Sequence, residues 1–195
     1  MRVPQPYNFH DGVLLMELVT DAHGDAAPRL NDVAFTPAQA LAHHTTLVGE
    51  VVRMLCAGVV HGDLSEFNIL LGHADIDSSA DTNGSAGGMD VPVIIDLPQA
   101  VDAAGNNHAQ RMLLRDVANL RDFFGQFAPA LLATNYGPEI WSLYQAGMLT
   151  NETPLTGQFD AQHAAIDMQA VMREIDDARA EDAARRLRMS TTGVS

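Results

Sequence analysis

The sequence predicts an α+β fold that is mostly helical, with short β-hairpins at one end. Several long segments place apolar side chains at helical spacing, whereas the strand-like runs are short and lie between turn residues. The chain has 195 residues, of which 47% are hydrophobic. This is enough for one domain with a sizeable core, and too few residues for two ordinary domains.

The N-terminal segment is expected to contain a hairpin. Asp11 and Gly12 form its turn, and a strand follows from Val13 to Val19. A loop then leads to Thr36, which stands before Pro37 as a helix N-cap stands before a first-turn proline.

The helix that starts there is predicted to end at about Ala57, before Gly58. It is expected to bury one face and the only cysteine of the chain, which lies in the apolar run VVRMLCAGVV and is interpreted as a core thiol. The predicted buried residues are Leu41, Val48, Val51, Leu55 and Cys56. The neighbouring pair His43–His44 is interpreted as lying on the helix surface.

Two short strands are predicted next, Val59–Val60 and the run FNILL at 67–71. Residues 72–90 are rich in Gly, Ser, Asp and Ala and are expected to form a flexible insert. The apolar run VPVIID predicts a buried strand over 91–96 that ends on an aspartate.

The remaining chain is predicted to be helical. Helices are expected over about His108–Phe127, Pro138–Ala146 and Ala161–Met189, followed by a disordered tail over 191–195. Arg115, Asp116 and Asp122 are interpreted as surface or lobe-bracing ion pairs of the first of these helices.

Charge and composition exclude several classes of function. The net charge of −14 argues against direct binding of nucleic acid, which needs a basic surface. No apolar run approaches the length of a membrane span, so no membrane association is expected. The single cysteine excludes an internal disulfide and suits a cytoplasmic location.

The stretch VVHGDLSEFNILL places polar groups inside an apolar segment. Asp63 and Asn68 would be costly there unless a metal ion, a proton in transit or a local polar network satisfies them. A second strand-associated acid, Asp96, follows later in VIIDLPQAV. Phosphoryl transfer to a hydroxyl needs a carboxylate that accepts the hydroxyl proton, and a second carboxylate and an amide oxygen that hold Mg²⁺. His61 is interpreted as holding the loop through a bond between its ring nitrogen and a nearby carbonyl.

These motifs resemble those of the RIO-type atypical serine/threonine protein kinases, nearest the RIO1-like and bacterial branch. HGDLSEFNIL resembles the catalytic loop of that family, and IIDLPQAV resembles its metal-binding loop. NNHAQRMLLRDVANLRDFF resembles the helix that follows, and RVPQPYNFHDGVLLMELV with APRLNDV resembles the hinge region. The resemblance covers about residues 3–127.

The resemblance implies a protein-kinase-like C-terminal lobe whose hairpins carry the catalytic and metal-binding loops. Residues 1–20 would be the last small-lobe strand and hinge, and 21–190 the large lobe. It implies ATP and Mg²⁺ as cofactors, with Mn²⁺ as a substitute ion, an unidentified protein substrate and a ribosome-related partner. The implied roles are catalytic aspartate for Asp63, metal ligands for Asn68 and Asp96, gatekeeper for Met16, adenine contacts for Glu17 and Val19, and a position near the γ-phosphate for Ser65 and Glu66.

The sequence also departs from the kinase pattern. It contains no lysine, and only fifteen residues precede Met16, so neither a Gly-rich loop nor a small-lobe lysine can be placed. The expectation is a large lobe without most of the small lobe. Three explanations stay open: the sequence starts at an internal methionine, the gene is truncated, or a second chain supplies the rest of the small lobe. Two alternatives stay open: a small-molecule phosphotransferase of the aminoglycoside or choline kinase type, and a non-catalytic fragment that serves as a binding module.

Overall fold

The computed structural model describes residues 1–74 and 89–159, and residues 1–157 form one compact unit. The predicted helix over 161–189, the tail and most of the predicted insert lie outside the described residues. The fold of this unit is α+β, with three α-helices and three separate two-stranded antiparallel sheets among the described residues.

The first hairpin pairs β1 (Pro6–His10) with β2 (Val13–Met16). Its turn is the predicted one, because Asp11 and Gly12 both have positive φ, at 47° and 81°. Two such residues give a turn whose twist matches that of the flanking strands. The strand ends at Met16, three residues earlier than predicted, because from Glu17 the chain leaves the hairpin.

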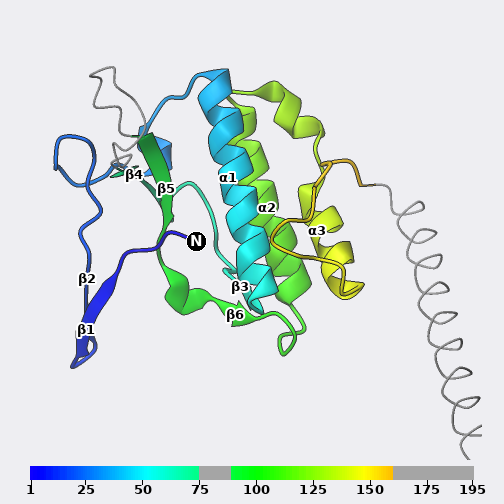
Figure 1. Ribbon diagram of the computed structural model, residues 1–195, viewed down its shortest axis with the longest axis horizontal. Helices are drawn as coiled ribbons and strands as arrows, with labels where there is room; N and C mark the ends of the chain where they lie inside the picture. Colours follow the sequence, from blue (N-terminus) through cyan, green and yellow to red (C-terminus); the bar gives the residue numbers. More distant parts are fainter. Residues whose placement is uncertain (75–88, 160–195) are drawn as a thin grey trace, which may run out of the picture. The chain divides into compact units, whose positions relative to one another are not determined.

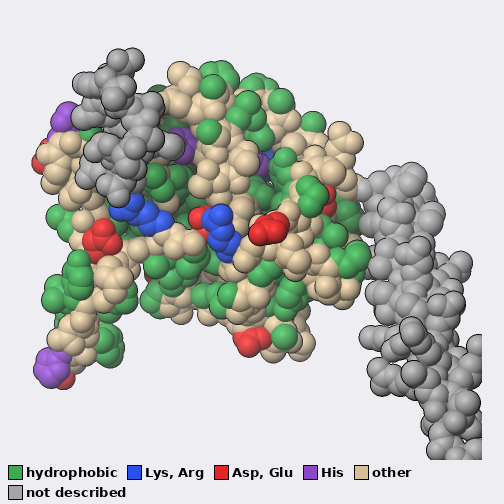
Figure 2. Space-filling view, viewed as in Figure 1, with side chains coloured by type: hydrophobic (Ala, Val, Ile, Leu, Met, Phe, Trp, Pro, Cys, Tyr) green, Lys and Arg blue, Asp and Glu red, His purple; other side chains and the backbone are tan. Residues whose placement is uncertain are grey.

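Both strands of this hairpin are exposed along their whole length. Large apolar side chains on it and just after it face solvent, and Figure 2 shows them in green along the hairpin. The most exposed are Tyr7, Phe9, Val13, Leu15 and Leu18. Because Leu14 and Met16 also line the cleft described below, this apolar surface continues directly into the candidate site.

Helix α1 (Pro37–Cys56) begins where the sequence predicts it. Thr36 and Gln39 form a reciprocal capping box, and Pro37 occupies the first turn. Each of these features satisfies or removes a backbone N–H that has no partner inside the helix. The helix ends at Cys56, and Gly58, which follows the C-cap Ala57, has a φ of 79°, the left-handed conformation typical of a residue just beyond a helix C-terminus.

The buried face of α1 agrees with the predicted one at Val48, Val51 and Leu55, which are buried. Leu41, however, is exposed, and His44, interpreted as a surface residue, is only 1% exposed. Cys56 is also exposed, so the interpretation of a core thiol is wrong. The face that packs inward is formed by Ala40, His44, Leu47, Val48, Val51, Val52, Met54 and Leu55.

Two small sheets follow α1. Strand β3 (Val59–Val60) pairs with β6 (Val101–Asp102), and β4 (Ile69–Ala74) pairs with β5 (Met89–Ile94). The β4–β5 pair reaches further than predicted, because Gly72, His73 and Ala74 are paired with Val91, Asp90 and Met89. The ends of the predicted insert therefore belong to a hairpin.

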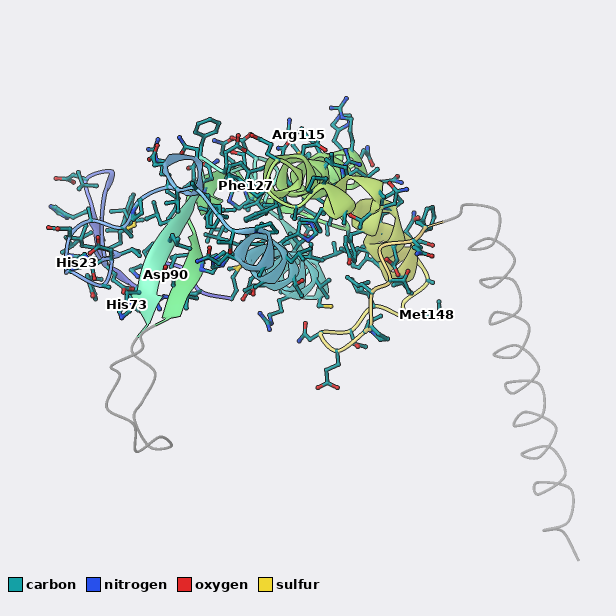
Figure 3. All side chains as sticks on the ribbon, turned by 90° about the horizontal axis from the view of Figure 1, so that it is seen from above. His23, His73, Asp90, Arg115, Phe127 and Met148 are labelled. Carbon is teal, nitrogen blue, oxygen red and sulfur yellow. The ribbon has the colours of Figure 1, made fainter. Side chains whose placement is uncertain are left out.

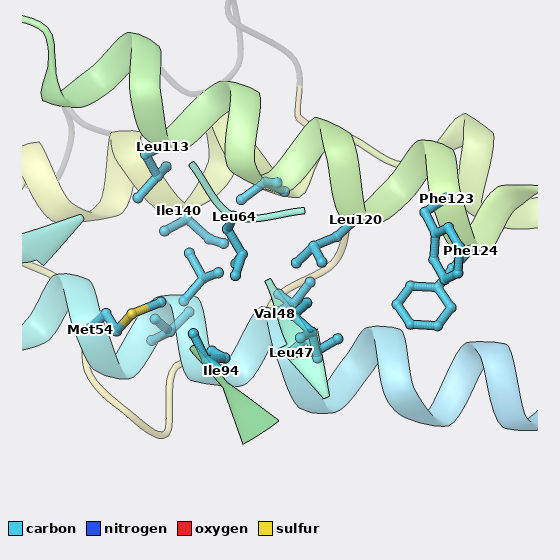
Figure 4. Packing of buried hydrophobic residues seen from close by; sticks show 14 of the residues in the cluster. Leu47, Val48, Met54, Leu64, Ile94, Leu113, Leu120, Phe123, Phe124 and Ile140 are labelled. Carbon is cyan, nitrogen blue, oxygen red and sulfur yellow. The ribbon is translucent and has the colours of Figure 1, made fainter. Parts of the chain in front are cut away.

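Helices α2 (Ala109–Gly125) and α3 (Tyr136–Gln145) complete the unit, with short 3-10 turns at Leu30–Asp32, Leu97–Gln99 and Pro129–Ala133. Figure 1 shows α1 and α2 side by side, and α2 also contacts α3. Buried side chains from all three helices meet between them, and Leu64 and Ile94 join this core from the loop and sheet (Figure 4). Apolar burial of this kind is the main favourable contribution to folding.

The burial of His44 predicts a specific pH dependence of stability. Burial lowers the pKa of His44 from its ordinary 6.5 to about 4. The unfolded chain takes up a proton as the pH falls below 6.5, whereas the folded protein resists protonation until about pH 4, so folding stability falls as the pH falls through this window. We expect His44 to account for a loss of about 2 kcal/mol between pH 7 and pH 5.

Urea denaturation of the wild type and of His44→Leu at both pH values measures this loss. The variant should lose correspondingly less stability on acidification, because other titrating groups contribute equally in both proteins. The control is His10→Gln, at an exposed histidine of the first hairpin. Equal pH dependence in wild type and His44→Leu would show that His44 is not held neutral.

Candidate active site

The loop after β3 begins with two residues that the fold holds tightly. His61 is 1% exposed, and its Nε2 lies 2.9 Å from the carbonyl oxygen of Ile95. The predicted bond from the His61 ring to a carbonyl is therefore confirmed, and it joins the exit of β3 to the exit of β5. Gly62 has a φ of 84°, a left-handed conformation that residues with a side chain rarely adopt.

Helix α2 holds the same loop through polar side chains. Asp116 is 2% exposed and accepts hydrogen bonds from the backbone N–H groups of Gly62 (2.8 Å) and Leu64 (3.1 Å). Asn119 donates from Nδ2 to the carbonyl oxygen of Leu64 at 2.9 Å. The residues on both sides of Asp63 are thus held through their backbone by one helix.

Asp116 was interpreted as part of a surface or lobe-bracing ion pair, and this is wrong. Burial raises the pKa of its carboxyl group above the ordinary 3.8, while the bonds from Gly62 and Leu64 and the nearby His61 and Arg115 act in the opposite direction. Its bonds go to backbone groups, as a buried carboxylate requires when no cation pairs with it directly.

Asp63 itself points outward from this held loop. Its side chain is 50% exposed, and its Oδ1 lies 3.8 Å from Nη2 of Arg115. Arg115 also donates to the carbonyl oxygen of Gly62. Figure 3 labels Arg115 on α2. A half-exposed carboxylate on a fixed backbone can exchange protons with a group that arrives from solvent.

Asn68 links Asp63 to the second acid. The side-chain Nδ2 of Asn68 donates to the backbone carbonyl oxygen of Asp63 at 2.8 Å. The backbone carbonyl oxygen of Asn68 accepts from the N–H of Ile95 at 3.0 Å. The side-chain nitrogen is therefore used within the loop, and the amide oxygen Oδ1 is the atom that can bind a cation.

Asp96 follows β5 and has a left-handed backbone, with φ of 65° and ψ of 42°. Non-glycine residues rarely adopt this conformation, and such residues cluster at functional sites. Gln99 donates from Nε2 to Oδ2 of Asp96 at 3.2 Å. The turn into the following Leu97–Gln99 segment therefore sets the direction of this carboxylate.

A cleft of about 660 Å³ lies between the chain segment after β2 and the ends of β4 and β5. Met16, Glu17 and Val19 line it on one side, and Asn68 and Asp96 line it on the other. Clefts of this size are typical of sites for small molecules and cofactors. The apolar part of its wall is formed by Val3, Leu14, Leu18, Ala27, Leu70, Ile94 and Leu97.

Hydrogen bonds hold the segment Glu17–Val19 at both of its ends. Glu17 donates its backbone N–H to the carbonyl oxygen of Gln5 at 2.8 Å and accepts at its Oε2 from the N–H of Gln5 at 3.0 Å. The carbonyl oxygen of Val19 accepts from the N–H of Ala27 at 2.9 Å. Gly72 packs against it, since a Cβ at Gly72 would lie 2.7 Å from the Val19 side chain.

The structure therefore brings five of the eight predicted site residues to one cleft. The other three, Asp63, Ser65 and Glu66, do not line it. Asp63 is connected to the cleft through the bond from Asn68 to its carbonyl oxygen. The carbonyl oxygen of Ser65 accepts from the N–H of Asn68 at 3.0 Å.

Sequence reasoning missed the way in which Arg115, Asp116 and Asn119 hold the loop. Their spacing on α2 was the available signal, because residues three and four apart share a helix face.

The donor set fits Mg²⁺ better than softer or more demanding ions. In residues 1–74 and 89–159, no three or more His, Cys, Asp or Glu side chains come together as a metal site. Asp96 with its carboxylate and Asn68 with its amide oxygen both line the cleft. Mg²⁺ takes few protein ligands of this kind and completes its coordination with water and phosphate oxygens.

No described helix has both the length and the hydropathy that crossing a membrane requires.

The RIO domain family model matches residues 1–79 and 87–136. The RIO-type serine/threonine-protein kinase Rio1 of Haloferax volcanii is 36% identical over 125 residues, which cover 64% of this chain and 36% of the relative. The RIO-type serine/threonine-protein kinase Rio2 of Methanocaldococcus jannaschii is 31% identical over 128 residues, covering 65% of this chain and 40% of the relative. The chain thus spans less than half the length of these relatives.

A solved structure shares the fold. The Rio2 kinase–ADP/Mg²⁺–phosphoaspartate complex from Chaetomium thermophilum superposes with a TM-score of 0.55 at 24% identity, over 90% of this chain and 49% of that one. This likeness supports the predicted protein-kinase-like architecture. Since the family model matches well over half of the residues, the chain belongs to the RIO domain family of serine/threonine-protein kinases.

Proposed function

We propose that the cleft binds ATP together with Mg²⁺, and that the site transfers the γ-phosphoryl group to a serine or threonine hydroxyl of a protein. One observation carries the proposal: Met16, Glu17 and Val19 line the same cleft as Asn68 and Asp96, although some fifty to eighty residues separate the two groups. A nucleotide needs this combination, with an apolar wall for the base and oxygen donors for the phosphate-bound cation.

The adenine would lie against the wall near Met16, with the backbone of Glu17 and Val19 at its polar edge. Bonds from Gln5 and Ala27 hold this segment, so little conformational entropy is lost when it binds the base. The phosphates would extend toward Asn68 and Asp96. Bound there, Mg²⁺ would neutralise part of the phosphate charge.

Asp63 is assigned the role of base. The hydroxyl oxygen forms a bond to the γ-phosphorus, the bond from that phosphorus to the β–γ bridging oxygen breaks, and ADP leaves with the electron pair. The hydroxyl proton passes to the carboxylate of Asp63. Four hydrogen bonds to the backbone of Gly62 and Leu64 fix the backbone that carries Asp63, and positioning supplies much of the catalysis in this chemistry.

A second candidate is ATP hydrolysis through Asp96. Its left-handed backbone and its place on the cleft favour a special role, and the Chaetomium thermophilum Rio2 complex is described as a phosphoaspartate. An oxygen of Asp96 would attack the γ-phosphorus, ADP would leave, and water would hydrolyse the acyl phosphate. Label from γ-labelled ATP that hydroxylamine releases would indicate this route, and label that resists hydroxylamine would indicate a phosphorylated hydroxyl.

Binding of ADP tests the proposal without depending on turnover. Titration calorimetry with Mg²⁺ and with EDTA should show that the ion increases the affinity for ADP, and Asp96→Asn should remove about tenfold or more of this increase, because a neutral amide replaces the charged ligand. Asp32→Asn, at an exposed acid outside the cleft, should behave like the wild type. A wild type that binds no ADP under either condition would refute the proposed function.

A further inference from the structure

Helix α2 contacts the loop around Asp63 with three side chains that lie on one face. Asp116 binds the N–H groups of Gly62 and Leu64, and Asn119 binds the carbonyl oxygen of Leu64. Arg115 binds the remaining carbonyl oxygen, that of Gly62. Helix α2 thus bonds to the backbone N–H and C=O of both residues that flank Asp63, Gly62 and Leu64.

Arg115 differs from the other two because it also reaches the carboxylate. Its Nη2 lies 3.8 Å from Oδ1 of Asp63, and the two side chains are 53% and 50% exposed. An ion pair this exposed contributes little to folding, since solvent screens the charges and ordering two side chains costs entropy. Its effect is therefore to be sought in the direction and charge environment of the Asp63 carboxylate.

One nitrogen of the guanidinium makes both contacts. Nη2 donates to the Gly62 carbonyl and also faces Oδ1 of Asp63, and the two N–H groups on this planar nitrogen keep a fixed angle, which the freely rotating ammonium of a lysine does not. The sequence contains no lysine, so no ammonium side chain of this chain can take the place of Arg115.

We propose, resting on the function proposed above, that Arg115 is a positioning residue for phosphoryl transfer. It holds Oδ1 of Asp63 and the Gly62 carbonyl in one arrangement, so that Oδ2 is directed to the acceptor hydroxyl. Arg115 transfers no atom itself, and the proton of the hydroxyl still passes to Asp63. Through Arg115, helix α2 then contributes to catalysis as well as to the hydrophobic core.

The first test reads the environment of Asp63 directly. The side-chain carboxyl ¹³C resonance of Asp63, assigned by its loss in Asp63→Asn, is compared in wild type, Arg115→Met and Arg111→Met at neutral pH. Arg111 is an exposed residue one turn earlier on the same helix. Arg115→Met should shift the Asp63 resonance, and Arg111→Met should leave it in place. An unshifted Asp63 resonance in Arg115→Met would overturn the proposal, whether or not the protein shows turnover.

The second test separates positioning from binding. With γ-labelled ATP and Mg²⁺, and with the N-terminal part of a RIO relative fused upstream of the 195 residues, Arg115→Met should lower kcat by about 10- to 100-fold and leave KM for ATP unchanged, since small misplacements of a reacting group cost this much. Arg115→Lys should restore part of kcat, because it keeps the charge and loses the planar nitrogen. Unchanged kcat in Arg115→Met, or a change confined to KM, would refute the role of Arg115. Absence of ADP binding in the wild type would instead count against the proposed function.

Discussion

Replacing Asp63 by asparagine should lower phosphoryl transfer at least about a hundredfold and leave the affinity for ADP nearly unchanged. Asparagine keeps the size of the side chain but cannot accept the hydroxyl proton, and a positioned base contributes about two to four orders of magnitude in rate. Binding should persist because Asp63 does not line the cleft. Folding should persist because its ion pair with Arg115 is half exposed.

Protein kinases align the phosphates of ATP with a lysine, and the 195 residues contain no lysine. We expect negligible transfer by the 195-residue chain for that reason. The variant is therefore best measured with the N-terminal part of a RIO relative fused upstream, using γ-labelled ATP and Mg²⁺. Asp102→Asn, at an exposed acid of β6, serves as the control. Wild-type turnover in Asp63→Asn would show that another group accepts the proton.

The parts of the fold that local chemistry determines were predictable from the sequence. The hairpin turn at Asp11 and Gly12 needs two positive φ angles, and the start of α1 needs an N-cap before a proline. Both signals involve neighbouring residues, so no knowledge of the packing was required. The protein-kinase-like fold class was predictable as well, because complete motifs such as HGDLSEFNIL can be recognised along the chain.

The apolar content of α1 did not predict which side of the helix is buried. The run VVRMLCAGVV is apolar almost throughout, so its composition does not define which side is buried. Packing against α2 and the β3 strand decides it, and Cys56 falls on the solvent side. His44 lies on the stripe that includes Ala40, Leu47 and Val48, and its spacing indicated burial, whereas its polarity suggested the surface.

The residues of the candidate site were predictable from the sequence, but the hydrogen bonds that hold their loop were not. Asp63, Asn68 and Asp96 stand in motifs that can be read along the chain. The bonds from Asp116 and Asn119 to the loop join residues more than fifty positions apart, which no local pattern reveals. The left-handed backbone of Asp96 also depends on how the chain turns after β5.

Among the supporting residues, Asp116 should have the largest effect on stability. Asp116→Ala would leave the N–H groups of Gly62 and Leu64 without acceptors in a buried place, and each unsatisfied donor costs about 1–3 kcal/mol. We expect a loss of about 3 kcal/mol or more in the free energy of unfolding. In a unit of this size, that corresponds to a fall in Tm of roughly 6–12 °C.

Urea denaturation of three variants tests the origin of this loss. Asp116→Asn keeps one acceptor oxygen and should lose less stability than Asp116→Ala. Asp122→Ala removes an exposed acid from the same helix and should change stability by no more than about 0.5 kcal/mol. If Asp116→Ala loses no more than Asp122→Ala, the loop amides must find other acceptors, and α2 does not hold the Asp63 loop in the way the hydrogen bonds indicate. If the loss of stability is largest in Asp116→Ala, smaller in Asp116→Asn and smallest in Asp122→Ala, the carboxylate of Asp116 is the group that binds the loop to the core.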